Sequence, residues 1–187
     1  FLQPLFYHAG FVRRGGDLFA EAEPIYSLPD DVVSSLQWWR FMLDHKLPTV
    51  SFNPEREAAV LNVFTDASSY GFGAVAPCLK EYFGDPWKSA EQTSASSTKW
   101  EMAAILFAVS VWAPRILDGV LIIHSDSASC VSIFRKRRAR NERLSIMLRL
   151  ITILQMVFRF QLVVVHLPGC LNYAADFLSR DWVPPPP

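Results

Sequence analysis

The chain has 187 residues, of which 51% are hydrophobic and 19% are charged, and its formal net charge at pH 7 is zero. This composition excludes an intrinsically disordered segment, because enough apolar surface is present to form a core. The length fits one sizeable α/β domain or a smaller domain with an extension. The neutral total predicts no polyanionic partner, so local charge is more informative than the total.

The cysteines and the apolar runs indicate the class of protein. Cys78, Cys130 and Cys170 are an odd number without C-x-x-C spacing, which favours reduced thiols in an intracellular protein of the cytoplasm or nucleus. The richest apolar run, residues 151–165, is interrupted by polar residues and is too short for a membrane span. The sequence begins at Phe1 without a signal sequence, so we expect a part of a longer polypeptide.

The first 58 residues are expected to form a connector. They contain five prolines and the pair Gly15-Gly16, which exclude long regular elements except for a helix near Asp30 to Asp44. Trp38 and Trp39 lie in this helix. Packing anchors are the more frequent role of such aromatic residues, and a base-stacking surface is the alternative.

The chain from residue 60 to residue 114 predicts three strands and a helix. Strands are expected at 60–65 and 72–77, joined by a turn over 66–71, and a third lies within 79–87 despite Gly84 and Pro86. Apolar residues then recur at helical spacing from Trp100 to Trp112, and Pro114 ends that pattern.

The second half adds two strands and three helices. We expect a strand at 120–123, a brief helix at 127–134, a longer helix at 144–158, a strand at 161–167 and a last helix towards Arg180, with Asn172 as a candidate cap. This order predicts an α/β fold with a mixed five-stranded sheet flanked by helices. The expected divisions are a connector at 1–58, the α/β domain at 59–182 and a proline-rich tail at 183–187.

Four carboxylates stand where the predicted strands or loops meet helices: Asp66, Glu101, Asp126 and Asp176. Each has an ordinary structural explanation. Asp66 fits an Asx turn, and Glu101 follows Thr98 at the spacing of a capping box. A helix cap explains Asp126, and an i, i+4 pair with Arg180 explains Asp176.

The four acids have a different meaning when they are taken together. Crossover connections bring strand ends and helix starts to one edge of such a sheet, where clustered carboxylates repel one another unless cations bind. Magnesium prefers oxygen ligands, so the pattern predicts a divalent-metal site for phosphoryl transfer. Gly71 and Gly73, together with the small side chains of Ser68 and Ser127, would let a large substrate approach.

Several segments carry a resemblance to a known family. In order along the chain they are Val63–Ser68, Trp100–Ala104, His124–Ser127 and Asn172–Arg180. Together they resemble the ribonuclease H domain of retroelement reverse transcriptases over about residues 60 to 182. The stretch from His166 to Arg180 is particularly similar to gypsy-like and DIRS-like elements, and the connector would then follow the polymerase thumb of the same polypeptide.

The resemblance implies a ribonuclease H-like fold and endonucleolytic cleavage of the RNA strand in an RNA:DNA hybrid. Asp66, Glu101, Asp126 and Asp176 would be both the catalytic and the metal-binding residues. They would hold two Mg²⁺ ions, for which Mn²⁺ can substitute, with Asp66 bridging the pair. A place in the first helical turn would favour the anionic form of Glu101 through the helix dipole.

A basic segment predicts where the substrate is held. Six cations fall within nine positions: Arg135, Lys136, Arg137, Arg138, Arg140 and Arg143. Phosphate contacts are the favoured interpretation, and a solvated face is the alternative. The expected nucleic-acid-binding set is Ser68, Gly71, Gly73, Ser127, Arg135, Lys136, Arg137, Arg138, Arg140 and Asn172.

One departure from the family keeps other interpretations open. The loop Pro168 to Leu171 lacks the histidine that cellular and retroviral members usually carry before the last acid, and His166 is expected to be an ordinary strand residue. A weakly active or inactive domesticated module for nucleic-acid or protein binding is therefore the alternative function. Other nucleases of the superfamily are a third possibility, although the place of Glu101 on the first long helix argues against integrases.

Overall fold

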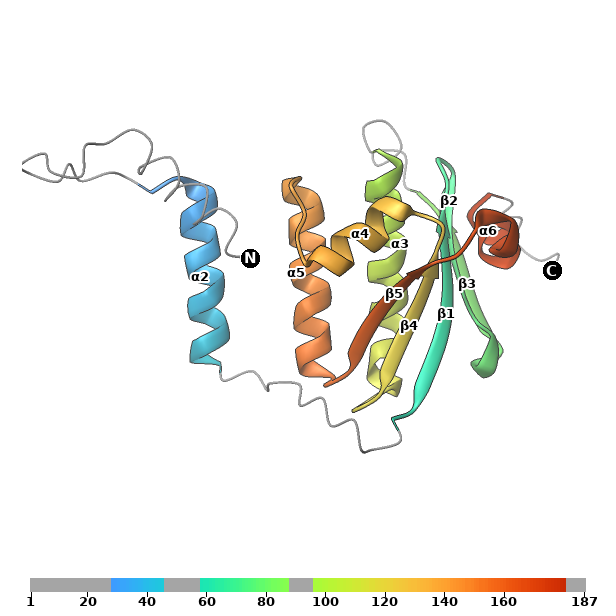
Figure 1. Cartoon of the computed structure of the whole chain (residues 1–187), viewed down its shortest axis with the longest axis horizontal. Coiled ribbons are helices and arrows are strands. Elements are labelled where there is room, and N and C mark those ends of the chain that lie inside the picture. Colours follow the sequence, from blue (N-terminus) through green and yellow to red (C-terminus); the bar gives the residue numbers. More distant parts are fainter. Residues whose placement is uncertain (1–27, 46–57, 88–95, 181–187) are drawn as a thin grey trace, which may run out of the picture. The chain divides into compact units, whose positions relative to one another are not determined.

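The computed structural model describes residues 28–45, 58–87 and 96–180. The chain divides into two compact units, residues 1–47 and residues 48–187, and the second unit contains the sheet (Figure 1). The predicted tail at 183–187, the Gly15-Gly16 pair and four of the five connector prolines lie outside the described residues. The predicted divisions at residues 58 and 182 stay predictions.

The described part of the first unit is the helix α2, Asp30–Asp44, as the sequence predicts. Pro29 precedes its first residue, and the Pro29 carbonyl accepts hydrogen bonds from the backbone N–H groups of Val32 and Val33. Proline suits this place because its fixed φ leads into a helix. Trp38 and Trp39 meet edge to face, with ring centroids 5.0 Å apart.

Five strands form one mixed sheet in the order β3-β2-β1-β4-β5. Their bounds are β1 Val60–Ala67, β2 Gly71–Ala76, β3 Glu81–Pro86, β4 Val120–Ser125 and β5 Gln161–His166. The first three strands pair antiparallel, whereas β4 runs parallel to both β1 and β5. The predicted mixed sheet is therefore confirmed. The predicted turn at residue 66 begins too early, because Asp66 still pairs with Gly73 inside the β1–β2 ladder.

Four helices cover the sheet: α3 Ser97–Trp112, α4 Ala128–Lys136, α5 Glu142–Val157 and α6 Tyr173–Arg180. Helices α3 and α5 pack against each other, and α3 also packs against β1 and β2. Helix α6 packs against β1, β2 and β3 and lies across the sheet from α3 (Figure 1). Among the described residues, no helix is both long enough and apolar enough to cross a membrane.

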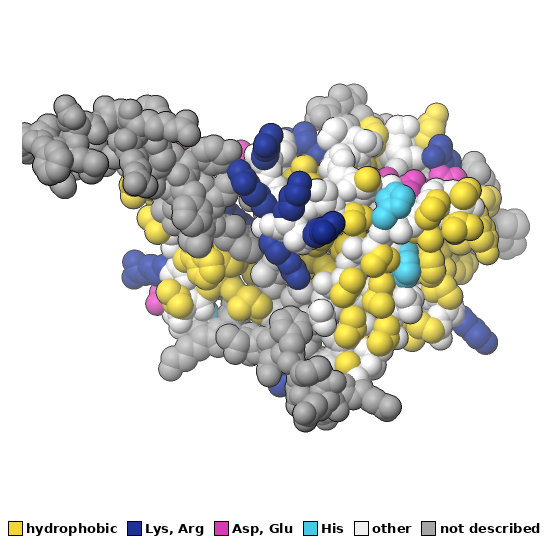
Figure 2. All heavy atoms as spheres, in the orientation of Figure 1, with side chains coloured by type: hydrophobic (Ala, Val, Ile, Leu, Met, Phe, Trp, Pro, Cys, Tyr) yellow, Lys and Arg dark blue, Asp and Glu magenta, His cyan; other side chains and the backbone are white. Residues whose placement is uncertain are grey.

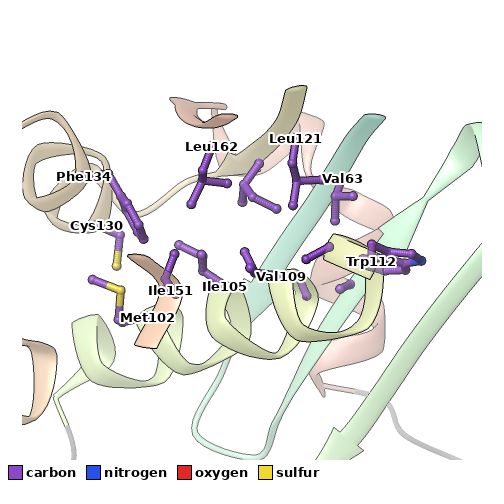
Figure 3. Packing of buried hydrophobic residues seen from close by; sticks show 14 of the residues in the cluster. Val63, Met102, Ile105, Val109, Trp112, Leu121, Cys130, Phe134, Ile151 and Leu162 are labelled. Atoms are coloured by element: carbon purple, nitrogen blue, oxygen red, sulfur yellow. The ribbon is translucent and has the colours of Figure 1, made fainter. Parts of the chain in front are cut away.

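The main core lies between the sheet and the helix pair α3 and α5. Side chains alternate along β4, so Leu121 and Ile123 are buried in this core while Ile122 points to the other face. Figure 3 shows Ile105 and Val109 of α3 facing Val63 and Leu121 of the sheet. This packing fixes how α3 crosses the sheet, and with it the position of the residues in its first turns.

Truncation of Ile151 should destabilise the domain strongly. Ile151 on α5 is fully buried, with 0% of its surface exposed, so Ile151→Ala should lower the free energy of unfolding by about 2–5 kcal/mol. Ile146 lies on the same helix and is 47% exposed, so the matched Ile146→Ala variant should cost less than about 1 kcal/mol. Urea denaturation of the full chain measures both, and equal losses would contradict the packing described for α5.

Candidate metal centre

Three of the four acids meet at one edge of the sheet. Phe64 lies opposite His124 in the parallel β1–β4 ladder, so two further residues along each segment bring Asp66 beside Asp126. Glu101 reaches the same place from the second turn of α3. One carboxylate oxygen from each of these three residues lies within 4.8 Å of the other two. The predicted convergence is therefore present for Asp66, Glu101 and Asp126.

Glu101 is the least satisfied of the three. Its side chain is 7% exposed and accepts a backbone hydrogen bond from Ala67, but its Oε2 atom has no hydrogen-bond partner. Burial, and to a smaller extent the charges of Asp66 and Asp126, raise the pKa of Glu101 to about 9. An orphaned carboxylate oxygen in this position costs stability in the absence of a cation.

Two predictions about Glu101 are wrong. Helix α3 begins at Ser97 after Ser96 and has no side-chain cap, so Glu101 does not form a capping box with Thr98. The first turn of α3 contains no acidic residue, and the helix dipole therefore does not hold Glu101 as an anion. The start of the helix lies in the polar residues before Trp100, where the spacing of apolar residues gives no signal.

Asp66 is buried but well held. Its side chain is 4% exposed, and Ser179 Oγ donates a hydrogen bond to Asp66 Oδ2 at 2.5 Å. Burial raises the pKa of this carboxyl group; the Ser179 hydrogen bond opposes that shift, while Asp126 adds to it. The predicted Asx turn is wrong, because the Ser68 hydroxyl accepts the turn's backbone hydrogen bonds from Tyr70 and Gly71 instead.

Asp126 is free of the capping role that the sequence suggested. The hydroxyl of Ser127 caps α4 by accepting from the Cys130 backbone N–H at 3.4 Å, because Ser127 and not Asp126 immediately precedes the helix. The short loop before α6 lies against the acid. A Cβ atom added to Gly169 would lie 3.2 Å from Asp126 Oδ2.

Asp176 lies outside the three-acid group. Arg180 Nε donates to Asp176 Oδ1 at 2.6 Å, which confirms the predicted i, i+4 pair. Asp176 is still close enough for its charge to raise the pKa of Asp66, and the positive charge of Arg180 has the opposite effect on Asp66. Of the four ordinary explanations, only the one for Asp176 is present in the structure.

The donor set fits a divalent cation. Carboxylate oxygens are the preferred ligands of Mg²⁺, and within the described part of the chain no salt bridge joins the three converging acids to a basic side chain. The orphaned Oε2 atom of Glu101 is a second observation that points to a ligand. Asp66, Glu101 and Asp126 are the residues that would hold the ion. Asp176, whose Oδ1 is paired with Arg180, would be the fourth ligand.

Four residues that the sequence predicted as substrate contacts make close contacts within the protein: Ser68, Gly71, Gly73 and Asn172. A Cβ atom at Gly73 would lie 2.5 Å from Leu178 Cβ, and one at Gly71 would lie 2.5 Å from the Asp85 carbonyl oxygen. Close packing against α6 and β3 therefore accounts for these two glycines, and substrate approach at them stays a prediction.

Ser68 and Asn172 are also internal. Ser68 Oγ donates to the Ser179 carbonyl oxygen at 2.5 Å. Asn172 is 1% exposed and directly precedes α6, yet its Nδ2 donates to the Thr65 carbonyl oxygen at 2.9 Å across the sheet. The side chain of Asn172 thus ties α6 to β1, and we do not retain it as a nucleic-acid contact.

The basic segment is exposed at the end of α4 and in the residues that follow. The exposed residues of the predicted set are Arg135, Lys136, Arg137, Arg138 and Arg140. Arg137 adopts a left-handed conformation and donates to Gln155 Oε1 at 3.3 Å. Figure 2 shows basic side chains gathered near α4 and α5, and acidic side chains at the rim near α6. His166 is exposed at the end of β5.

The cysteines take no part in the centre. All three are free, and burial raises the pKa of Cys130 to about 12, so its thiol stays protonated. The residue that sequence reasoning missed is Ser179. It follows Asp176 by three residues in the last helix, and this spacing places both on one helix face.

Comparisons with known proteins agree with this architecture. Residues 57–156 match the family described as the RNase H-like domain found in reverse transcriptase. A search of curated proteins found no match.

Solved structures show the same fold at low identity. RNase H1 from the halophilic archaeon Halobacterium salinarum is 18% identical with a TM-score of 0.50, covering 64% of this chain and 94% of that one. LC11-RNase H1, solved with an RNA/DNA hybrid, is 17% identical with a TM-score of 0.53, covering 63% and 92%. An N-terminal RNase H domain from Mycobacterium tuberculosis is 16% identical with a TM-score of 0.52, covering 65% and 90%.

Neutralising Glu101 should stabilise the metal-free protein at high pH. The folded state keeps a proton that the unfolded chain releases above a pKa of 4.5, so stability falls as the pH rises from there towards 9. Glu101→Gln removes that dependence and should add on the order of 5 kcal/mol at pH 8.5 in EDTA, measured as a higher melting temperature.

Two controls distinguish this pH-dependent stabilisation from a general increase in stability. At pH 4.5 the advantage of Glu101→Gln should largely disappear, and Glu142→Gln, at an exposed position on α5, should show no comparable gain at pH 8.5. Added Mg²⁺ should stabilise the wild type more than Glu101→Gln, because only the wild type keeps the full ligand set. A pH-independent advantage would show that burial of charge at Glu101 is not its cause.

Proposed function

The chain belongs to the family of RNase H-like domains found in reverse transcriptase, and from this membership we propose that it cleaves the RNA strand of RNA:DNA hybrids. The observation that carries the proposal is the convergence of Asp66, Glu101 and Asp126, together with the lack of a hydrogen-bond partner for Glu101 Oε2. A protein of the same fold, LC11-RNase H1, was solved with an RNA/DNA hybrid, which supports this substrate class.

The acids would act on the scissile phosphate through bound metal. Two Mg²⁺ ions, or Mn²⁺ in their place, would supply an activated water and stabilise the leaving 3′ oxygen, giving 5′-phosphate and 3′-hydroxyl ends. Asp66, Glu101, Asp126 and Asp176 are the residues that would hold these ions. Glu101 must release its proton to serve as a ligand, because burial keeps it protonated at neutral pH in the metal-free protein.

Basic side chains would hold the hybrid. The proposed contacts are Arg135, Lys136, Arg137, Arg138 and Arg140, all exposed at the end of the short helix α4 or just beyond it. This helix begins two residues after Asp126. Phosphate contacts from such residues position a duplex without reading its sequence. Ser127 caps α4 and is partly exposed beside Asp126, and it stays in the proposed nucleic-acid-binding set.

The setting of the domain forms part of the proposal. The polymerase domain of the same retroelement polypeptide is the proposed partner, because the matched family is found in reverse transcriptase. We also propose an intracellular location. Cys78 and Cys170 are exposed free thiols, which suits a reducing compartment.

Loss of one acid should abolish hybrid cleavage. Asp126→Asn should lower the rate of hybrid cleavage with Mg²⁺ by more than roughly 100-fold. Loss of a hydrogen-bond partner outside the ligand shell already costs up to that much at a metal site, and Asp126 is a proposed ligand. Asp66→Asn should have at least as large an effect. The measurement is cleavage of a hybrid labelled on its RNA strand by the full chain.

The control for this prediction is Asp85→Asn, which removes an exposed carboxylate on β3 and should leave the rate unchanged. Single-stranded RNA and duplex DNA serve as alternative substrates. Hybrid binding without cleavage by the wild type would favour a binding module instead, and equal cleavage by Asp126→Asn would contradict the assigned centre.

Removal of basic charge should weaken binding in a salt-dependent way. The double variant Arg135→Gln/Lys136→Gln should bind hybrid more weakly for every sequence and lower the salt slope of log K by about 2, one for each phosphate that is no longer neutralised. Fluorescence anisotropy over a salt series measures this. The control is Lys80→Gln, because Lys80 is exposed and follows β2 at the end of that strand away from Asp66. An unchanged salt slope in the double variant would indicate that Arg135 and Lys136 belong to a solvated face.

A further inference from the structure

The hydroxyl group of Ser179 is buried against the central acid of the proposed centre. Ser179 lies in the last turn of α6 and is 1% exposed. Its Oγ atom is 2.5 Å from Asp66 Oδ2 and 2.9 Å from the Asp176 carbonyl oxygen. A hydroxyl group has one proton, and an ionised carboxylate is the stronger acceptor, so the hydroxyl donates to Asp66.

A second serine fixes the backbone of the first. Ser68 Oγ donates to the Ser179 carbonyl oxygen at 2.5 Å, across 111 residues of sequence. The same Ser68 oxygen accepts from the backbone N–H groups of Tyr70 and Gly71, so its own position is held by the β1–β2 turn. Ser68 thus anchors the end of α6 to the end of β1, and the Ser179 side chain then reaches back to Asp66.

Close packing prevents α6 from shifting away from this arrangement. A Cβ atom at Gly73 would lie 2.5 Å from Leu178 Cβ, and one at Gly84 would lie 3.0 Å from the Leu178 carbonyl oxygen. The helix therefore rests directly on the backbones of β2 and β3. The Ser179 hydroxyl therefore approaches Asp66 from a helix that is packed directly against the sheet.

We propose that Ser179 is a positioning residue for the metal centre: its hydroxyl holds Asp66 Oδ2 in place and ties Asp66 to the helix that carries Asp176. The inference rests on the proposed function, because it assigns Ser179 a role in that same centre. Carboxylate ligands of metals need such outer hydrogen bonds, which fix their orientation without occupying every lone pair. Arg180 and Ser179 then serve two different acids from adjacent positions of one helix.

The test measures Mn²⁺ binding by the full chain, a readout that does not depend on hybrid cleavage. Ser179→Ala should weaken Mn²⁺ binding by roughly 10- to 100-fold, followed by the electron paramagnetic resonance signal of free Mn²⁺. Ser110→Ala is the matched control. It deletes the same hydroxyl group from a helix, where Ser110 Oγ donates to the Leu106 carbonyl oxygen at 2.8 Å, and it should leave Mn²⁺ affinity unchanged.

A double-mutant cycle distinguishes positioning from a general loosening of α6. Ser179→Ala should cost much less Mn²⁺ affinity in an Asp66→Asn background, because the carboxylate that it orients is already gone. An equal cost in both backgrounds would overturn the proposal. Should Ser179→Ala not fold, Ser179→Cys keeps the side chain's shape with a weak donor, and wild-type Mn²⁺ affinity in that variant would overturn it as well.

The outcomes separate this inference from the function on which it rests. Wild-type protein that neither binds Mn²⁺ nor cleaves hybrid would overturn the metal centre and the role of Ser179 together. Wild-type protein that binds and cleaves, with Ser179→Ala of equal Mn²⁺ affinity, would overturn the role of Ser179 alone. Weakened Mn²⁺ binding in Ser179→Ala, with the effect absent in the Asp66→Asn background, supports it.

Discussion

The parallel pairing of β1 with β4 is the constraint on which the candidate centre depends. Because Phe64 lies opposite His124, the two chain segments leave the sheet at the same edge, and Asp66 and Asp126 leave with them. A parallel pair requires a crossover connection, and here α3 belongs to that crossover. The register therefore places Asp66 and Asp126, and the packing of α3 against the sheet brings Glu101 to the same edge.

Burial makes this edge costly in the absence of metal. The pKa values of Asp66 and Glu101 are both raised, chiefly by burial and further by neighbouring acids, and Glu101 also retains an unpartnered oxygen. Asp66 is the better held of the two because Ser179 donates to it. The unfavourable energy is therefore concentrated at Glu101, which is where a bound cation would relieve it.

The other face of the sheet explains residues that the functional interpretation of the sequence assigned to substrate. Gly71 and Gly73 allow backbones to approach within the protein, and Ser68 and Asn172 connect α6 to the end of β1. These contacts hold α6 against β1 on the face of the sheet opposite α3. Packing thus requires small and polar residues next to the acids as much as substrate access does. The exposed basic segment after α4 remains the proposed contact for the phosphates of the hybrid.

The order and type of the elements, the mixed sheet and the Asp176–Arg180 pair were predictable from the sequence, because periodicity, element order and i, i+4 spacing are properties of the chain itself. The family pattern of the segments pointed to four acids, of which Asp66, Glu101 and Asp126 converge. The three-dimensional packing was needed to show that Ser127 rather than Asp126 caps α4, that Glu101 lies in the second turn of α3, and that Ser179 donates to Asp66. The Ser179–Asp66 bond joins residues 113 positions apart, and such contacts depend on strand register and helix packing.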